Sequence, residues 1–212
     1  MLYGFHEGGL EVRRQSDGSV SLRGAFPYGA RAVLSDGGRV GRPRKEEFAP
    51  RAFAYNVERA DVDIHLLVGH DYAKPLASRA TGTLSLKDGA EALTFSAVIT
   101  RAIAETSHGR DALALLTSGL AVGLSPGFRI PPERAVPKAE EITEEPDDGS
   151  LDDDGQPRRG AIVRTILAAL LYELSIMTRP AYSQAQVEAR CWRPEPLRQS
   201  VPMVRTLRRW RP

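Results

Sequence analysis

The chain has 212 residues, of which 42% are hydrophobic and 26% are charged. This composition fits one globular domain with appended flexible segments, large enough to bury a core. No apolar run approaches the roughly 20 residues of a membrane-spanning helix, and the N-terminus lacks the charged-then-apolar pattern of a secretion signal. The single cysteine, Cys191, excludes an internal disulfide and gives no support to a metal cluster. We therefore expect an intracellular protein that does not span a membrane.

The charged residues are unevenly distributed along the chain. Residues 140–154 contain nine acidic side chains and no Lys or Arg, which leaves 18 acidic against 29 basic residues elsewhere, a net charge of +11. A basic surface favours an acidic partner, either nucleic acid or an acidic protein, but charge alone does not identify which.

The first quarter of the chain contains few regular signals. Residues 1–18 are glycine-rich and polar, and we expect them to be flexible. The first predicted strand covers residues 19–26, where apolar and polar side chains alternate. Residues 46–53 are predicted to start a short helix after a proline-containing basic stretch. Within that segment, Phe48 and Phe53 are predicted to be core anchors.

The middle of the chain has clearer periodicity. Residues 61–69 alternate apolar and polar side chains, which is the period of a half-buried strand, and His70 follows at its end. Residues 81–86 and 91–100 predict a β-hairpin with an Asp-Gly turn. Residues 107–118 predict a helix, after which the chain re-enters a strand.

The last third combines a polar insertion, a strand region and a basic tail. Proline, glycine and acidic residues predominate in residues 131–160, so we expect a disordered acidic insertion there. Residues 161–177 are predicted to form strands in which Tyr172 and Glu173 alternate between opposite faces. The arginine- and proline-rich residues 191–212 predict a disordered tail.

Residues 123–127, with the sequence GLSPG, indicate a nucleophilic serine at Ser125. They match G-x-S-x-G, the nucleophile elbow of α/β-hydrolases, but that fold places its histidine after the serine. All four histidines of this chain precede Ser125. The elbow also uses the backbone N–H of the next residue as an oxyanion donor, and Pro126 has none. We interpret Ser125 as the nucleophile of a different serine hydrolase.

A metal site is not expected from the histidine spacing. His65 and His70 are five residues apart, which places them on opposite faces of a strand and out of register on a helix. We therefore expect neither a metal nor a cofactor.

Five stretches, PRKEEFAPRAF, LLVGHD, TGTLSL, GLAVGLSPGF and LYELSIMTRPAY, together resemble the prohead (capsid-maturation) protease family of tailed phages, from about residue 22 to 190. The resemblance implies a herpesvirus-assemblin-like fold: an α+β, mainly β class with a closed or partly open antiparallel β-barrel and surrounding short helices. The protease domain would cover residues 19–190, between the flexible N-terminus and the tail. It also implies a serine endopeptidase that acts inside the immature phage prohead, in the host cytoplasm.

The resemblance also implies roles for three residues. His70 corresponds to the general base, Ser125 to the nucleophile and Glu173 to the third member of a triad. A serine hydroxyl needs a neighbouring imidazole to take its proton, and a carboxylate on the other ring nitrogen fixes the tautomer. We expect Glu173 to fill that third role, and Asp71 remains the alternative because it adjoins His70 in sequence.

Two positions depart from the family pattern. Gly69 stands where an asparagine commonly precedes the histidine, and Pro126 follows the serine. The second departure leaves the oxyanion donors unassigned.

The resemblance implies the major capsid protein and the scaffold as substrates, together with the protease itself. A homodimer is left open, no membrane is involved and nucleic acid is not required. Two alternatives remain: a catalytically inactive relative that acts as a scaffold or capsid-binding assembly protein, and an unrelated hydrolase.

Overall fold

The computed structural model describes residues 2–6, 10–38, 41–121, 123–151, 155 and 157–178. The predicted tail at residues 191–212 lies outside them. The described part of the chain contains thirteen strands and three short helices, so the mainly β prediction is confirmed. In chain order the elements are β1 (Leu2–His6), β2 (Leu10–Arg14), β3 (Val20–Pro27), β4 (Ala32–Ser35), β5 (Arg44–Phe48), α1 (Ala54–Val57), β6 (His65–Val68), β7 (Asp71–Ser78), β8 (Leu84–Asp88), β9 (Ala92–Ile99), α2 (Arg101–Ala104), α3 (Ser107–Thr117), β10 (Gly123–Arg129), β11 (Glu140–Glu144), β12 (Ile162–Ile166) and β13 (Leu170–Met177).

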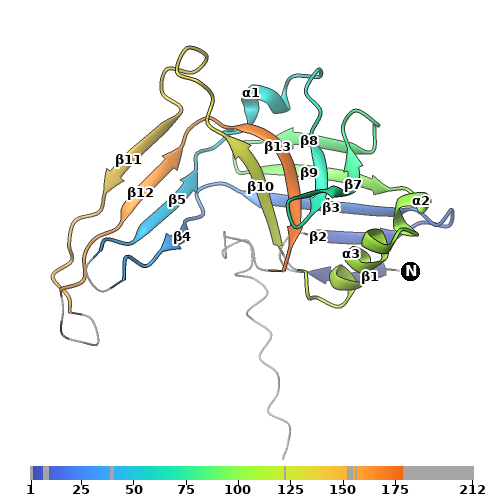
Figure 1. Cartoon of the computed structure of the whole chain (residues 1–212), viewed down its shortest axis with the longest axis horizontal. Coiled ribbons are helices and arrows are strands. Elements are labelled where there is room, and N and C mark those ends of the chain that lie inside the picture. Colours follow the sequence, from blue (N-terminus) through green and yellow to red (C-terminus); the bar gives the residue numbers. More distant parts are fainter. Residues whose placement is uncertain are drawn as a thin grey trace, which may run out of the picture.

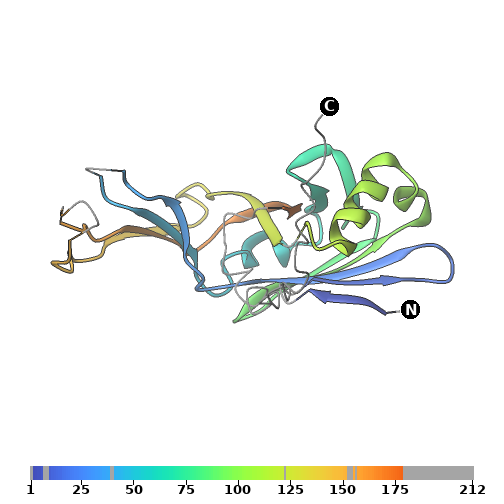
Figure 2. The ribbon, with the colours of Figure 1, turned by 90° about the horizontal axis from the view of Figure 1, so that it is seen from below.

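The strands form three sheets, with the orders β1-β2-β3-β9-β8, β10-β13-β6-β7 and β11-β12-β5-β4. The first two sheets and the helices make up a body, and the third sheet, here called the arm, projects from it (Figures 1 and 2). No closed barrel forms among the described residues, so the expected assemblin-like barrel is not confirmed. In the arm, β5 and β12 pair in parallel, and both run toward the body, where they end at Phe48 and Ile166.

An aromatic cluster lies where the three sheets meet. It joins Phe26 on β3, Phe48 at the end of β5, Phe53 before α1 and Phe128 on β10. The ring centroids of Phe48 lie 4.9 Å from those of both Phe53 and Phe128, and 5.4 Å from that of Phe26. Phe48 and Phe53 are fully buried, which confirms them as core anchors. Burial of each such ring contributes about 2 kcal/mol, so the cluster fixes the arm and β10 on the body.

The arm corrects the prediction for residues 131–160. Residues 140–144 form β11, which pairs antiparallel with β12. Arg164 on β12 binds Glu140 at 2.5 Å and Glu46 at 3.0 Å, and Lys45 on β5 binds Glu145 at 2.9 Å. The expectation of an unstructured insertion was wrong here. It rested on the acidic composition of the segment alone, whereas neighbouring strands place cations opposite these carboxylates.

Two further expectations were wrong for a related reason. Residues 2–6 and 10–14, which belong to the stretch expected to be flexible, form β1 and β2, and β2 pairs with β3. Residues 46–48 were predicted to begin a helix but belong to β5, whose partner β12 lies more than 110 residues further along the chain. A local sequence pattern contains no signal for pairing with so distant a strand, and such tertiary contacts override local propensity.

The other predicted elements are confirmed. The hairpin appears as β8 and β9, the helix as α3, and the final apolar stretch as β12 and β13. Helix α3 begins after Thr106, whose hydroxyl accepts a hydrogen bond of 3.1 Å from the backbone N–H of Gly109. None of the described helices has the length and apolar character needed to cross a membrane.

Candidate active site

His70 is held in a two-residue turn between β6 and β7. Gly69 and His70 have φ angles of 63° and 61°, the positive values that type I′ hairpin turns require at both central positions. Glycine adopts such a conformation without steric cost, whereas a non-glycine residue is strained there. The turn is anchored to β13, because Gly69 donates its N–H to the carbonyl of Ile176 at 3.2 Å and His70 donates its N–H to the hydroxyl of Ser175 at 2.8 Å.

The three side chains predicted from the sequence lie in contact around the imidazole of His70. Its Nε2 lies 3.1 Å from Oγ of Ser125 on β10, and its Nδ1 lies 2.6 Å from Oε1 of Glu173 on β13. A carboxylate can only accept, so the proton in the second contact belongs to Nδ1. Nε2 is then free to accept from the serine hydroxyl, which is the arrangement that allows an imidazole to take a hydroxyl proton.

Ser175 completes the environment of Glu173 and was not singled out from the sequence. Its side chain is fully buried, and its hydroxyl donates to Oε2 of Glu173 at 2.7 Å while accepting from the backbone N–H of His70. Glu173 is itself only 3% exposed, and a buried carboxylate is costly unless its oxygens are hydrogen-bonded. Ser175 therefore links the carboxylate to the backbone of the turn that carries the imidazole.

Gly127 provides the space that the carboxylate of Glu173 occupies. The two residues are partners in the antiparallel register of β10 and β13. A β-carbon on Gly127 would lie 1.9 Å from Oε1 of Glu173 and 2.6 Å from its carboxyl carbon. Only glycine permits this approach, which explains the second glycine of GLSPG without an elbow.

Among the residues that the structure describes, Asp71 contacts only its near neighbours in sequence, although it follows His70 directly. Its carboxylate accepts from the backbone N–H of Ala73 at 2.9 Å and lies 3.1 Å from Nζ of Lys74. The Ala73 N–H, assisted by Lys74, lowers the pKa of Asp71. These are the contacts of a polar turn, whereas Glu173 is the carboxylate that reaches the ring of His70.

The two departures from the family pattern have different structural consequences. At Gly69, asparagine and glycine are both residues that accept a positive φ, so the turn does not need the asparagine. Pro126 lies on β10, an edge strand of its sheet, which is the place where a missing N–H is best tolerated. Pro126 still contributes no oxyanion donor, so any such donor comes from elsewhere.

A cleft of 390 Å³ opens beside His70 and shares Glu173 and Gly127 with the contacts described above. The register of β10 and β13 slips between Gly127 and Phe128, which leaves Tyr172 as an extra residue on β13. Such a bulge re-aims side chains, and Tyr172 and Glu173 line the same cleft instead of opposite faces. The complete lining is His70, Tyr72, Gly127, Phe128, Arg129, Tyr172 and Glu173.

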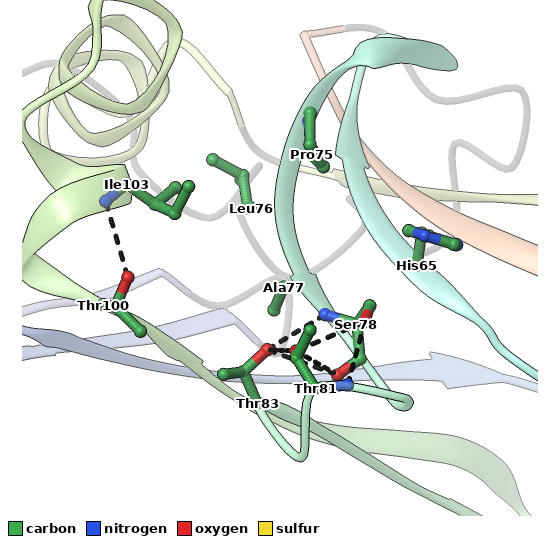
Figure 3. Close-up of a pocket in the computed structure, with 9 residues that line it drawn as sticks. All are labelled: His65, Pro75, Leu76, Ala77, Ser78, Thr81, Thr83, Thr100 and Ile103. Carbon is green, nitrogen blue, oxygen red and sulfur yellow. Dashed lines mark hydrogen bonds between the residues drawn. The ribbon is translucent and has the colours of Figure 1, made fainter.

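A second cleft of 320 Å³ lies along β7, next to α2, and contains none of the three predicted site residues (Figure 3). Its polar side chains already bind one another: the hydroxyl of Thr81 lies 2.7 Å from that of Thr83 and 3.2 Å from that of Ser78. His65 lines this cleft and lies 3.4 Å from Asp63. The first cleft is therefore the better candidate for binding a reacting group.

The comparison with known families agrees with this geometry. A family model described as caudovirus prohead serine protease matches residues 38–200, which include all three residues grouped around the imidazole. No curated protein and no solved structure gives a significant match. The matched segment covers most of the chain, and the chain therefore belongs to the caudovirus prohead serine protease family.

Proposed function

We propose that this protein is an active serine endopeptidase in which Ser125 is the nucleophile, His70 the general base and Glu173 the residue that orients His70. The observation that carries the proposal is the pair of contacts made by one imidazole, 3.1 Å to the hydroxyl and 2.6 Å to the carboxylate. Family membership supports a role in phage capsid maturation.

The chemistry follows from these contacts. As Oγ of Ser125 bonds to the carbonyl carbon of the scissile peptide, its proton passes to Nε2 of His70. Glu173 stays ionised and stabilises the resulting imidazolium through Nδ1–H. When the tetrahedral intermediate collapses, the C–N bond breaks and Nε2–H gives its proton to the departing amine. Water then attacks the ester carbon, His70 takes a proton from that water, and Ser125 regains its hydroxyl proton as the new carboxyl group leaves.

The proposed substrates are the major capsid protein, the scaffold and the protease itself, inside the immature prohead in the host cell. The family supports capsid proteins as the substrate class. Incubation of the purified protein with its capsid and scaffold precursors, followed by sequencing of the new termini, identifies the bonds that are cut. Precursors that stay intact with unlabelled protease, when a parallel sample of the same protease reacts with an active-serine fluorophosphonate, would be excluded as substrates.

Labelling with an active-serine fluorophosphonate tests the catalytic assignment. The wild type should incorporate one label, and Ser125→Ala and His70→Ala should each lower the rate of peptide cleavage by several orders of magnitude, because triad members act as a unit. Circular dichroism checks that both variants are folded. Undiminished cleavage by Ser125→Ala would remove Ser125 from the mechanism.

One observation favours the alternative of a catalytically inactive assembly protein: Pro126 cannot supply the oxyanion donor that a backbone N–H after the nucleophile would offer. The same labelling separates the two functions. A folded wild type that neither labels nor cleaves, yet binds capsid or scaffold protein, would favour the alternative.

A further inference from the structure

Arg129 lies at the end of β10, in the cleft beside His70. Its side chain is exposed, and its guanidinium carbon lies 5.7 Å from the ring centroid of Tyr172. This is a cation–π contact, in which the cation is attracted to the electron-rich face of the ring. The contact holds Arg129 beside Tyr172 without using its hydrogen-bond donors, and no hydrogen bond joins those donors to another described residue.

Within the described ranges of the chain, no carboxylate lies within 4.0 Å of Arg129, whereas Arg164 in the arm binds two. The nearest acidic member of the cleft is Glu173, and it is already engaged. Its Oε1 binds His70 and its Oε2 binds Ser175. Arg129 therefore brings to the cleft a cation that forms no ion pair with a described carboxylate.

The remaining polar wall of the cleft is Tyr72. Burial and the nearby charge of Glu173 raise the pKa of Tyr72, so its hydroxyl keeps its proton and can donate a hydrogen bond. The Tyr72 ring packs edge-on against His65, with centroids 5.8 Å apart. The cleft thus combines a fork of cationic donors with phenolic donors, a set that matches a carboxylate.

We propose that this cleft is a substrate subsite that binds an acidic side chain of the polypeptide being cleaved, with Arg129 as its cation. The proposal rests on the proposed peptidase function, since the cleft shares His70 with the catalytic contacts. Arg129 and the two tyrosines select the substrate and take no part in the chemistry at Ser125.

The strand geometry sets the position of the acidic residue. Arg129 follows Ser125 by four residues on β10, so their Cα atoms are about 13 Å apart along an extended strand. An extended substrate advances about 3.3 Å per residue. The acidic residue therefore lies about two to four positions from the scissile bond, and does not flank it directly.

The experiment compares cleavage sites and then matched peptides. The full-length protein is incubated with a denatured bacterial proteome, and mass spectrometry of the new termini shows whether Asp and Glu are enriched at one position near the cut. A cleaved peptide is then synthesised with Glu, Gln or Lys at that position. We expect a kcat/KM for the Glu peptide about fivefold above that for the Gln peptide, a modest factor because the cleft is partly exposed.

Variants assign the preference to Arg129. Arg129→Met should bring the Glu-to-Gln ratio near one, and Arg129→Glu should favour the Lys peptide. Arg110→Met, at an exposed arginine on α3, is the matched control and should retain the wild-type ratio.

The other outcomes distinguish a failure of the proposed subsite from a failure of the proposed peptidase function. A wild type that labels with fluorophosphonate and cleaves the Glu and Gln peptides equally overturns the subsite alone, as does a preference that survives Arg129→Met. Inhibition by a single-stranded DNA oligonucleotide that depends on Arg129, without a Glu preference, would assign the cleft to phosphate instead. A wild type that neither labels nor cleaves overturns the proposed function and the subsite with it.

Discussion

Replacing Gly127 by alanine tests whether Glu173 acts from the position in which the structure places it. The added β-carbon would lie 1.9 Å from Oε1 and 2.6 Å from the carboxyl carbon of Glu173, far inside van der Waals contact. The backbone of Gly127 lies outside the left-handed region, so alanine is acceptable there on conformational grounds. The perturbation is therefore confined to the carboxylate.

The expected loss of activity exceeds the expected loss of stability. To escape the methyl group, the carboxylate must leave its contacts with His70 at 2.6 Å and Ser175 at 2.7 Å. Loss of a triad carboxylate lowers turnover by roughly 10²- to 10⁴-fold, or about 3 to 5 kcal/mol in the activation free energy. Overpacking of a buried site costs about 1 to 3 kcal/mol of folding free energy, which a domain of this size can tolerate.

The assay is kcat/KM on a cleaved peptide, with the thermal midpoint measured on the same samples. In a Glu173→Ala background the obstructed carboxylate is absent, so adding Gly127→Ala should change the rate by less than about threefold. Gly89→Ala is a control for glycine replacement, because Gly89 also lies outside the left-handed region and its β-carbon position is 3.2 Å from the carbonyl oxygen of Ala92, away from the site. It should affect activity little. If Gly127→Ala lowered kcat/KM equally in both backgrounds, its effect would not come from displacing the carboxylate of Glu173, and the reasoning would be refuted.

Three other predictions follow from the same geometry. Glu173→Gln should lower kcat/KM by roughly 10²- to 10⁴-fold and Asp71→Asn by less; the reverse ranking in folded variants would give Asp71 the third role. Ser175→Ala should lower kcat about 10- to 100-fold at similar KM by releasing a buried carboxylate oxygen, and equal rates for Ser175→Ala and Ser175→Thr would limit Ser175 to packing. Deletion of residues 139–155 should lower the thermal midpoint by at least about 3 °C, because it removes β11; calorimetry showing no change would contradict a structural role for that strand.

The elements that could be predicted from the sequence are those with a local signal. The strand leading to His70, the hairpin and helix α3 each show their period within a dozen residues. The contact among His70, Ser125 and Glu173 was expected because each residue lies in its own family-like stretch. Gly127 was missed because its importance depends on the register of β10 against β13, which joins segments almost 50 residues apart. Ser175 was missed because its contact with His70 depends on the pairing of β13 with β6.

The arm shows how composition fails where charge pairs across strands. Residues 140–145 are mostly acidic, and an isolated segment of that kind cannot offset the entropy of ordering. In the structure Arg164 and Lys45 supply the opposing charge from β12 and β5. The sequence does show a surplus of basic residues outside this segment. Only the strand order β11-β12-β5, however, shows which cation lies opposite which carboxylate.

Strict alternation of side chains along β13 leaves no place for a bulge. The cleft, however, depends on the bulge. Strict alternation would place Tyr172 on the face opposite Glu173. One extra residue between the pairs Gly127–Glu173 and Phe128–Leu171 instead brings both side chains to the same cleft. On β10, ordinary alternation places Phe128 in the aromatic cluster and Arg129 in the cleft. The unpaired Tyr172 thus lies in the same cleft as Glu173, so that one residue supports the proposed substrate cation and its neighbour binds His70. No periodicity in the sequence indicates where the extra residue occurs.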